Sequence, residues 1–162
     1  MIVSDAGPIV VFARIGRLSL LRDVTGTLLI PDAVHSEIFV KKGAMPGASE
    51  VAQATWIQRV AVADRSNVDR MPKVLHAGER EAIALAKERG AQLLVDEIRA
   101  RRAARVQGVE VIGTLRILDN AKRSGHISLA RPIIAQMQSQ GYRFDRTLIL
   151  RFLEIVGEGQ IL

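Results

Sequence analysis

The sequence predicts an α/β fold with three layers (α/β/α) and a parallel sheet of about five strands. Short apolar runs typical of buried strands alternate with longer amphipathic segments typical of helices through most of the 162 residues. Strand-helix-strand connections of this kind are right-handed crossovers between parallel strands, with helices covering both faces of the sheet. No linker interrupts the pattern, so we expect residues 1–162 to form a single domain with one core.

Composition narrows the functional classes. Hydrophobic residues make up 48% and charged residues 25%, as in ordinary globular domains. The absence of cysteine excludes disulfides, thiolate nucleophiles and Cys-ligated zinc, and His35, His76 and His126 are too scattered for a zinc motif. No apolar run approaches a membrane span, and the first residues suggest a strand rather than a signal peptide. We therefore expect a cytoplasmic protein with no membrane contact.

The net charge of +6, from 23 Lys and Arg against 17 Asp and Glu, favours a polyanionic partner, with nucleic acid as the first candidate. The alternative is a well-solvated basic surface. One Trp, one Tyr and four Phe residues are too few and too scattered for a base-stacking platform. Any contact with nucleic acid is therefore expected to be through phosphates.

The first elements place an acid at the end of a strand. Residues 2–4 form a short buried strand that ends on Asp5, and Pro8 suits the first turn of the following helix. The alternative for Asp5 is that it only caps this helix. A second amphipathic helix covers 17–24, and 27–30 forms the next strand.

The next helix, 32–41, carries an acid on its apolar side. Glu37 lies within the arc defined by Val34 and Ile38. The alternative is that Glu37 reaches the rim or pairs with an arginine. After this helix we expect a loop at 43–47, a weaker helix at 48–54, an irregular strand at 56–62 and a polar loop at 64–73.

Residues 76–97 read as a helix, a glycine turn and a buried strand. Glu79 shares one side of the helix with Ala82 and Ile83, whereas Glu81 projects to the other side. An unpaired buried carboxylate costs several kcal/mol, so Glu79 requires a cation, a proton or a cleft. The strand ends on Asp96, and ligand crevices in parallel sheets lie beyond the carboxyl ends of strands.

The remaining elements add candidate substrate contacts. Arg101 and Arg102 lie on an arginine-rich helix, and Thr114 follows the next strand, so it is expected at the same rim as Asp5 and Asp96. The alternatives are a solvated helix face and an ordinary N-cap. The strand of this half is expected at 109–112. Its four helices are expected at 98–107, 115–124, 129–140 and 145–156.

The carboxylates that this pattern gathers are Asp5, Glu37, Glu79 and Asp96. Like charges brought together raise one another's pKa values and oppose folding unless a cation neutralises them. Oxygen ligands without His or Cys favour Mg²⁺ or Mn²⁺, which can activate water and stabilise a phosphate under attack. Phosphodiester hydrolysis is therefore predicted. A glycosidase would need aromatic platforms, and the P-loop, GxGxxG and GxSxG motifs are absent.

Five segments in order resemble the PIN domain, in its prokaryotic branch of unassigned function, over about residues 1–155: IVSDAGP, LLIPDAVHSEI, GEREAIALAKERGAQLLVDE, RARRAA and VIGTLRIL. The resemblance implies a parallel five-stranded sheet and a metal-dependent ribonuclease site. The family's four acids correspond, in order, to Asp5, Glu37, Glu79 and Asp96. Two features depart from the pattern: Ala6 stands where many members carry Thr or Ser, and Glu97 aligns as well as Asp96 with the fourth acid.

The resemblance thus implies an endoribonuclease dependent on Mg²⁺ or Mn²⁺, similar to the toxins of toxin–antitoxin pairs. Asp5 and Asp96 are expected to hold the principal metal, with Glu37 and Glu79 completing its shell directly or through water. RNA, a small antitoxin protein and a second copy of the chain are the expected partners. Two alternatives stay open: a catalytically silent PIN-like module that binds nucleic acid or protein, and a structure-specific DNA nuclease.

Overall fold

Five short strands form one all-parallel sheet, as predicted, and their order in the sheet is β3-β2-β1-β4-β5. They are seen in a computed structural model that describes residues 1–41 and 45–159. Ser4 of β1 pairs with Leu94 of β4, which brings the carboxyl ends of these two strands to one level. The strand bounds are β1 Ile2–Ser4, β2 Leu28–Ile30, β3 Ile57–Arg59, β4 Gln92–Leu94 and β5 Val111–Ile112.

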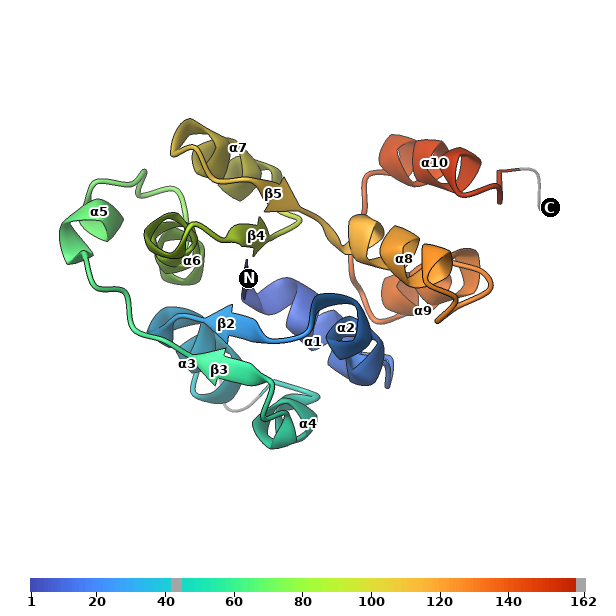
Figure 1. Cartoon of the computed structure of the whole chain (residues 1–162), viewed down its shortest axis with the longest axis horizontal. Coiled ribbons are helices and arrows are strands. Elements are labelled where there is room, and N and C mark those ends of the chain that lie inside the picture. Colours follow the sequence, from blue (N-terminus) through green and yellow to red (C-terminus); the bar gives the residue numbers. More distant parts are fainter. Residues whose placement is uncertain (42–44, 160–162) are drawn as a thin grey trace.

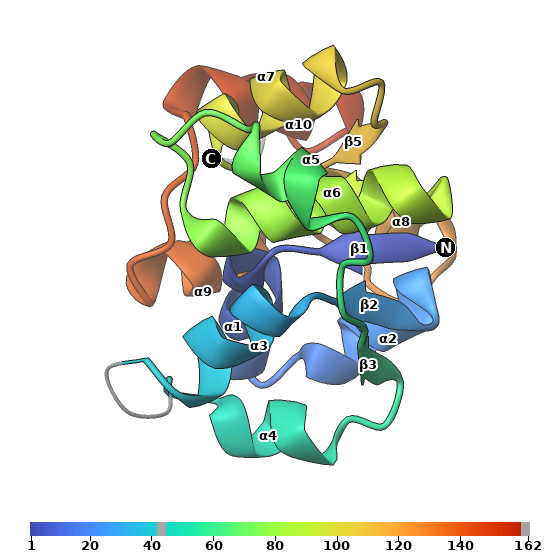
Figure 2. The same ribbon diagram turned by 90° about the vertical axis from the view of Figure 1, so that its left-hand side faces the viewer.

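Helices cover both sides of this sheet (Figures 1 and 2), which confirms the three-layer α/β/α class. Helix α6 packs against α3, α5 and α7, while α2 packs against α1 and α8. None of the described helices is long and apolar enough to cross a membrane. The helix bounds are α1 Ala6–Arg14, α2 Leu18–Thr25, α3 Asp32–Phe39, α4 Ala48–Gln53, α5 Arg65–Asp69, α6 Ala77–Arg89, α7 Ile98–Val106, α8 Thr114–Arg123, α9 Arg131–Ser139 and α10 Arg146–Ile155.

The central strands are buried on both faces. All three residues of β2 are buried, and so are Leu93 and Leu94 of β4. Strands that are covered on both faces need continuous apolar side chains rather than an alternating pattern. The polar residues of β1 and β4 are therefore confined to the strand ends, and Asp5 and Asp96 follow these two strands.

The segment 64–73, predicted as a polar loop, contains the short helix α5. The carboxylate of Asp64 accepts hydrogen bonds from the backbone N–H groups of Ser66 and Asn67, which caps the first turn. The strand predicted at 56–62 is shorter in the structure, as β3. Of the loop predicted at 43–47, residues 43 and 44 lie outside the described residues.

The carboxylate of Glu81 is buried, contrary to the predicted outward orientation. It accepts a hydrogen bond from the backbone N–H of Ala33 at 3.0 Å, and Arg65 Nη1 lies 3.0 Å from its other oxygen. The helical projection was wrong because α3 and α5 cover the side of α6 that it left to solvent. Glu81 therefore accepts one of the N–H groups in the first turn of α3, which have no partner within that helix.

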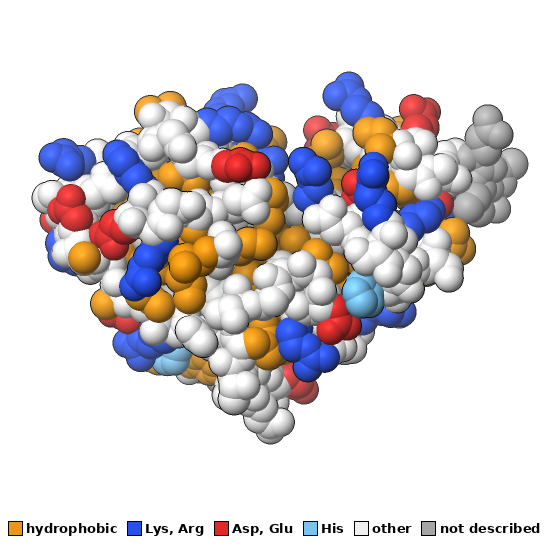
Figure 3. All heavy atoms as spheres, in the orientation of Figure 1, with side chains coloured by type: hydrophobic (Ala, Val, Ile, Leu, Met, Phe, Trp, Pro, Cys, Tyr) orange, Lys and Arg blue, Asp and Glu red, His pale blue; other side chains and the backbone are white. Residues whose placement is uncertain are grey.

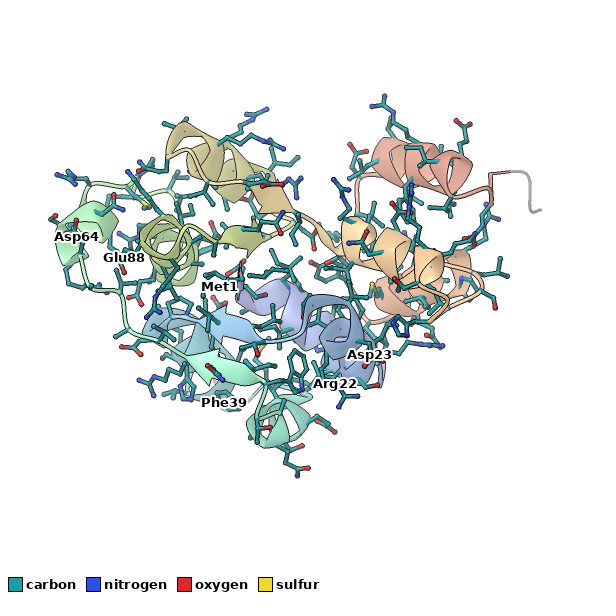
Figure 4. All side chains as sticks on the ribbon, viewed as in Figure 1. Met1, Arg22, Asp23, Phe39, Asp64 and Glu88 are labelled. Atoms are coloured by element: carbon teal, nitrogen blue, oxygen red, sulfur yellow. The ribbon has the colours of Figure 1, made fainter. Side chains whose placement is uncertain are left out.

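The connection into α5 is also tied to α6. The carboxylate of Glu88 accepts hydrogen bonds from the backbone N–H groups of Ala63 and Asp64, at 3.1 and 2.7 Å. Figure 4 labels Asp64 and Glu88, which lie on neighbouring elements at the left of the view. Together, Glu81 and Glu88 fix α6 between α3 and the α5 segment, and α6 in turn carries Glu79.

Candidate active site

Asp5 lies at the carboxyl edge of the sheet, directly after β1. Its backbone N–H donates to the carbonyl of Leu94 at 3.0 Å, which fixes Asp5 beside the end of β4. Asp5 occupies the N-cap position of α1, but its side chain forms no capping hydrogen bond. A simple cap would bond to the second or third helical N–H. The Asp5 carboxylate is therefore not used to cap α1 and is available to bind a ligand.

Glu37 and Glu79 come to the same edge from α3 and α6. Gly78, in the first turn of α6, locates the acids: a Cβ atom there would lie 3.7 Å from Glu37 Oε2 and 3.8 Å from Asp5 Oδ1. Glu79 is the next residue and is only 8% exposed. The positive end of the α6 dipole favours negative charge at this position. Three of the predicted acids thus surround the N-terminus of α6.

The electrostatics agree with this placement. Burial is the largest cause that raises the pKa of Asp5 to about 7, followed by the charge of Glu37; Glu79 and Asp96 contribute less, and a hydrogen bond from the Ala6 N–H opposes the rise. Burial also raises the pKa of Glu79; the charge of His76 opposes this, and weaker repulsion from Glu97 and Glu37 adds to it. Neighbouring acids thus hinder the ionisation of Asp5 and of Glu79, as expected for carboxylates that share one site.

Asp96 reaches the same edge from β4 and is held by hydrogen bonds from the chain itself. The Thr114 N–H donates to Oδ1 at 2.8 Å, and the hydroxyl groups of Thr114 and Tyr142 both donate to Oδ2. Gly113 permits this arrangement, because a Cβ atom there would lie only 2.9 Å from Asp96 Oδ1. The orientation of Asp96 is therefore set by the start of α8 and by Tyr142.

Tyr142 is a site residue that sequence reasoning missed. It lies between α9 and α10, and its hydroxyl oxygen would be 3.6 Å from a Cβ atom at Gly7. Its ring meets Phe144 edge to face at 5.1 Å between centroids. Burial, then the charge of Asp96 and the hydrogen bond to it, raises the pKa of Tyr142 above its ordinary value. The sequence signal was an aromatic residue in a short connection that otherwise looked like a turn.

Two ambiguities of the sequence can now be described structurally. Glu97 is exposed and caps α7, where its Oε2 accepts the Ala100 N–H at 2.9 Å; its charge acts on Glu79, whereas the charge of Asp96 acts on Asp5. Ala6 offers no hydroxyl. The hydroxyl groups near the acids come instead from Thr114 and Tyr142.

The three predicted substrate contacts have different environments. Arg101 lies near Asp96 and donates from Nη1 to the Val95 carbonyl at 2.8 Å; burial, then the charge of Arg105, lowers its pKa, and Asp96 opposes this. Arg102 is exposed on α7. Thr114 is fully buried against Asp96, so in this structure it positions that carboxylate and is not open to a substrate.

The donor set fits a hard divalent cation in its chemistry. Carboxylate oxygens are the ligands that Mg²⁺ and Mn²⁺ prefer. In residues 1–41 and 45–159, however, no three His, Cys, Asp or Glu side chains lie close enough together to hold one ion directly. Mg²⁺ commonly binds through one or two carboxylates and keeps several waters. The geometry is thus compatible with an ion held by Asp5 and one neighbour, with the other acids acting through water.

We expect the metal-free protein to lose stability as the pH rises from about 4 to about 7. The pKa of Asp5 is about 7 in the folded state against an ordinary 3.8, so the folded state binds the proton more tightly. This contribution, at most about 4 kcal/mol, is complete at low pH and is lost once Asp5 ionises. Urea unfolding in EDTA at pH 5 and pH 8 measures it. Asp5→Asn should reduce the difference, and an unchanged difference would contradict the assignment.

The fold and the acidic edge together define a PIN-like α/β/α domain. The DUF3368 family model, described as a PIN domain, matches residues 1–158, and the chain belongs to this family. PIN domains are generally nucleases.

Two solved structures are similar to this chain. One is a PilT N-terminus domain protein from the hyperthermophilic archaeon Sulfolobus solfataricus P2, with 18% identity, a TM-score of 0.53 and coverage of 75% of this chain and 93% of that chain. Another is a domain of a functionally unknown protein from Methanocaldococcus jannaschii DSM 2661, with 21% identity, a TM-score of 0.45 and coverage of 69% and 89%. The first supports the fold. No curated protein matches the sequence.

Proposed function

We propose that this PIN domain is a metal-dependent endoribonuclease that hydrolyses phosphodiester bonds in RNA. One observation carries the proposal: Asp5 lies with Glu37, Glu79 and Asp96 at one edge of the sheet, and their charges hinder its ionisation. Within the described residues, none of the four acids forms an ion pair with Lys, Arg or His. Charge that the chain leaves uncompensated is what a bound cation would neutralise.

The residues divide into two groups by their surroundings. Asp5 has no capping bond and would be a direct ligand, with Asp96 held ready by Thr114 and Tyr142. Glu37 and Glu79 would complete the shell or orient the attacking water. A divalent ion bound there supplies the positive charge that activates water and stabilises the phosphate.

RNA is proposed as the substrate because of the PIN fold and the net charge of +6. A role as the toxin of a toxin–antitoxin pair, a small antitoxin protein as inhibitor, and a homodimer are further parts of this proposal, and they have only the family resemblance as support. They can be tested once cleavage has been measured.

Metal dependence is the first test of this function. We expect a labelled, unstructured RNA to be cleaved in millimolar Mn²⁺, to stay intact in EDTA, and to be cleaved again when Mn²⁺ is restored in excess. The readout is denaturing gel electrophoresis of the products. Cleavage that continues in EDTA would overturn the proposed mechanism, and no cleavage of any RNA in Mn²⁺ would overturn the enzymatic function.

A catalytically silent PIN-like module is the second candidate. The observation that favours it is the environment of Asp96, whose two oxygens already accept three hydrogen bonds from Thr114 and Tyr142. Isothermal titration with Mn²⁺ distinguishes the two functions. A nuclease binds Mn²⁺ at millimolar concentration or below, whereas a silent module shows no binding in that range.

A further inference from the structure

The connection between α9 and α10 carries Tyr142 to the acidic edge of the sheet. Figure 1 shows α8, α9 and α10 grouped at one end of the longest axis of the molecule. Helix α9 ends at Ser139 and α10 begins at Arg146, and between them the Tyr142 hydroxyl donates to Asp96 Oδ2. A residue of the C-terminal helices therefore occupies an oxygen of a candidate metal ligand.

The Tyr142 hydroxyl lies near both acids that are expected to hold the principal metal. Asp5 is fixed beside the end of β4, because its N–H donates to the Leu94 carbonyl. The hydroxyl oxygen would be 3.6 Å from a Cβ atom at Gly7, two residues after Asp5. Burial, then the charge of Asp96, raises the pKa of Tyr142, and the charge of Asp5 adds to the rise. The hydroxyl thus lies close to the space that a cation shared by the two acids would need.

The hydrogen bonds to Asp96 leave little of its carboxylate for a cation. A carboxylate has about four lone-pair sites, two on each oxygen. Oδ2 accepts the hydroxyl groups of Thr114 and Tyr142, and Oδ1 accepts the Thr114 N–H. The remaining site on Oδ1 is close to a guanidinium group: a Cβ atom at Gly113 would lie 2.9 Å from Oδ1 and 3.0 Å from Arg101 Nη1. Because that charge repels a cation, binding at Asp96 requires a donor on Oδ2 to leave.

Of the two donors on Oδ2, Tyr142 is the one that is free to leave. Thr114 is fully buried in the first turn of α8 and also donates to Asp96 from its backbone. Residues 140–142 border a cavity of about 220 Å³ beside α1, and residues 143–145 border a cleft of about 540 Å³ beside α7 and α8. Figure 3 shows the surface indented at the top of the view, between the part carrying α7 and the part carrying α10. The connection that carries Tyr142 therefore has open space in which to move.

The helix pair itself stays anchored at its other end. The buried carboxylate of Glu158, after α10, accepts the Ala130 N–H at 2.8 Å and lies 2.9 Å from Lys122 Nζ on α8. Gly141, with a φ of +85°, provides a left-handed turn directly before Tyr142, which side chains other than that of glycine rarely allow. The connection can thus turn at Gly141 while α9 and α10 remain on α8.

We propose that Tyr142 is an autoinhibitory latch, which closes on Asp96 in the metal-free protein and swings away before Asp96 binds a divalent cation. This inference rests on the proposed metal-dependent function and concerns the regulation of that same site. The ion and the latch compete for one carboxylate oxygen, so each lowers the affinity of the other. A latch that is closed most of the time reduces the apparent ion affinity by the fraction of open molecules.

A Tyr142 that only positions Asp96 is the competing interpretation. The hydroxyl would then stay on Asp96 when the ion binds, and its removal would weaken ion binding. The full occupancy of Oδ2 favours the latch. Among the residues that the structure describes, no three His, Cys, Asp or Glu side chains lie close enough together to hold an ion, as expected of a site in its closed state.

Tyr142→Phe tests the latch through ion binding, because it removes the hydroxyl and keeps the ring. We expect isothermal titration with Mg²⁺ to show binding at least about tenfold tighter than in wild type, since a hydrogen bond to a charged group holds the latch closed. The matched control is Thr114→Val, which removes the other hydroxyl from the same oxygen but leaves Tyr142 in place. It should tighten binding less than about twofold. Equal or weaker binding by Tyr142→Phe, or equal tightening in both variants, would overturn the latch.

A second measurement follows the latch directly. Tyr142 is the only tyrosine of the chain, so labelling with 3-fluorotyrosine gives one ¹⁹F resonance. We expect saturating Mg²⁺ to move this resonance to the position of a solvent-exposed tyrosine, and the same Mg²⁺ concentration to leave it unchanged in Asp5→Asn. A resonance that keeps its buried position while Mg²⁺ binds would overturn the latch and leave the metal-dependent function standing.

The two proposals can fail separately. If Tyr142→Phe binds Mg²⁺ more tightly than wild type but cleaves no RNA, the nuclease function fails while the latch stands. If neither wild type nor Tyr142→Phe binds Mg²⁺ at millimolar concentration, both proposals are overturned.

Discussion

Asp5→Asn is expected to reduce Mn²⁺-dependent RNA cleavage more than about 100-fold, measured as initial rates at saturating metal. Changes in groups around a metal's direct ligands already cost about 10–100-fold, and Asp5 is the acid that the other three surround. Asparagine keeps the size of the side chain but removes the charge and one anionic oxygen.

The matched control is Asp23→Asn. Asp23 is exposed on α2, 3.4 Å from Arg22, and Figure 4 labels both residues on that helix. Its replacement removes the same charge from the protein and should leave the cleavage rate within about twofold, because screened surface pairs contribute little. Equal rate losses in the two variants would mean that net charge, and not a site at Asp5, governs the activity.

Tyr142→Phe is expected to lower the free energy of unfolding by about 1.5–3 kcal/mol. The tyrosine hydroxyl donates to Asp96, and a hydrogen bond to a charged group that is shielded from water contributes about this much. Phenylalanine retains the ring and its contact with Phe144, so packing should change little. Urea unfolding at pH 7 gives the difference, with an unchanged m-value.

A second variant shows whether Tyr142 acts through Asp96. Thr114→Val removes the other hydroxyl that donates to the same Asp96 oxygen. Two donors to one carboxylate oxygen form a single network, so the effects of Tyr142→Phe and Thr114→Val should not add, with an interaction energy of about 0.5 kcal/mol or more. Strict additivity would show that the two hydroxyl groups act independently.

The sequence was sufficient to predict the parallel sheet and the edge of the sheet at which Asp5 and Asp96 lie. Continuous apolar runs such as 28–30 and 92–94 identify strands that are buried on both faces, and alternation with helices makes them parallel. The carboxyl ends of neighbouring parallel strands share one edge, so Asp5 and Asp96 had to lie there. This inference required only the order of strands and helices along the chain.

Contacts between elements that are distant in the chain could not be predicted from the sequence. Glu81 was assigned to solvent because a helical projection does not show that α3 and α5 cover that side. Tyr142 meets Asp96 across 46 residues, and this contact depends on how α9 and α10 dock. The aromatic residues were judged too scattered, yet Tyr142, Phe144 and Phe152 gather near Asp96 in the fold.

The account depends on one claim, that acids from β1, α3, α6 and β4 serve a common cation. Crystals soaked in millimolar MnCl₂ and measured for anomalous scattering test it most directly. We expect an anomalous peak at about 2.1 Å from an Asp5 carboxylate oxygen, with a second carboxylate among Glu37, Glu79 and Asp96 bound directly or through one water. A well-ordered site without such a peak, or manganese bound only elsewhere on the protein, would contradict the claim.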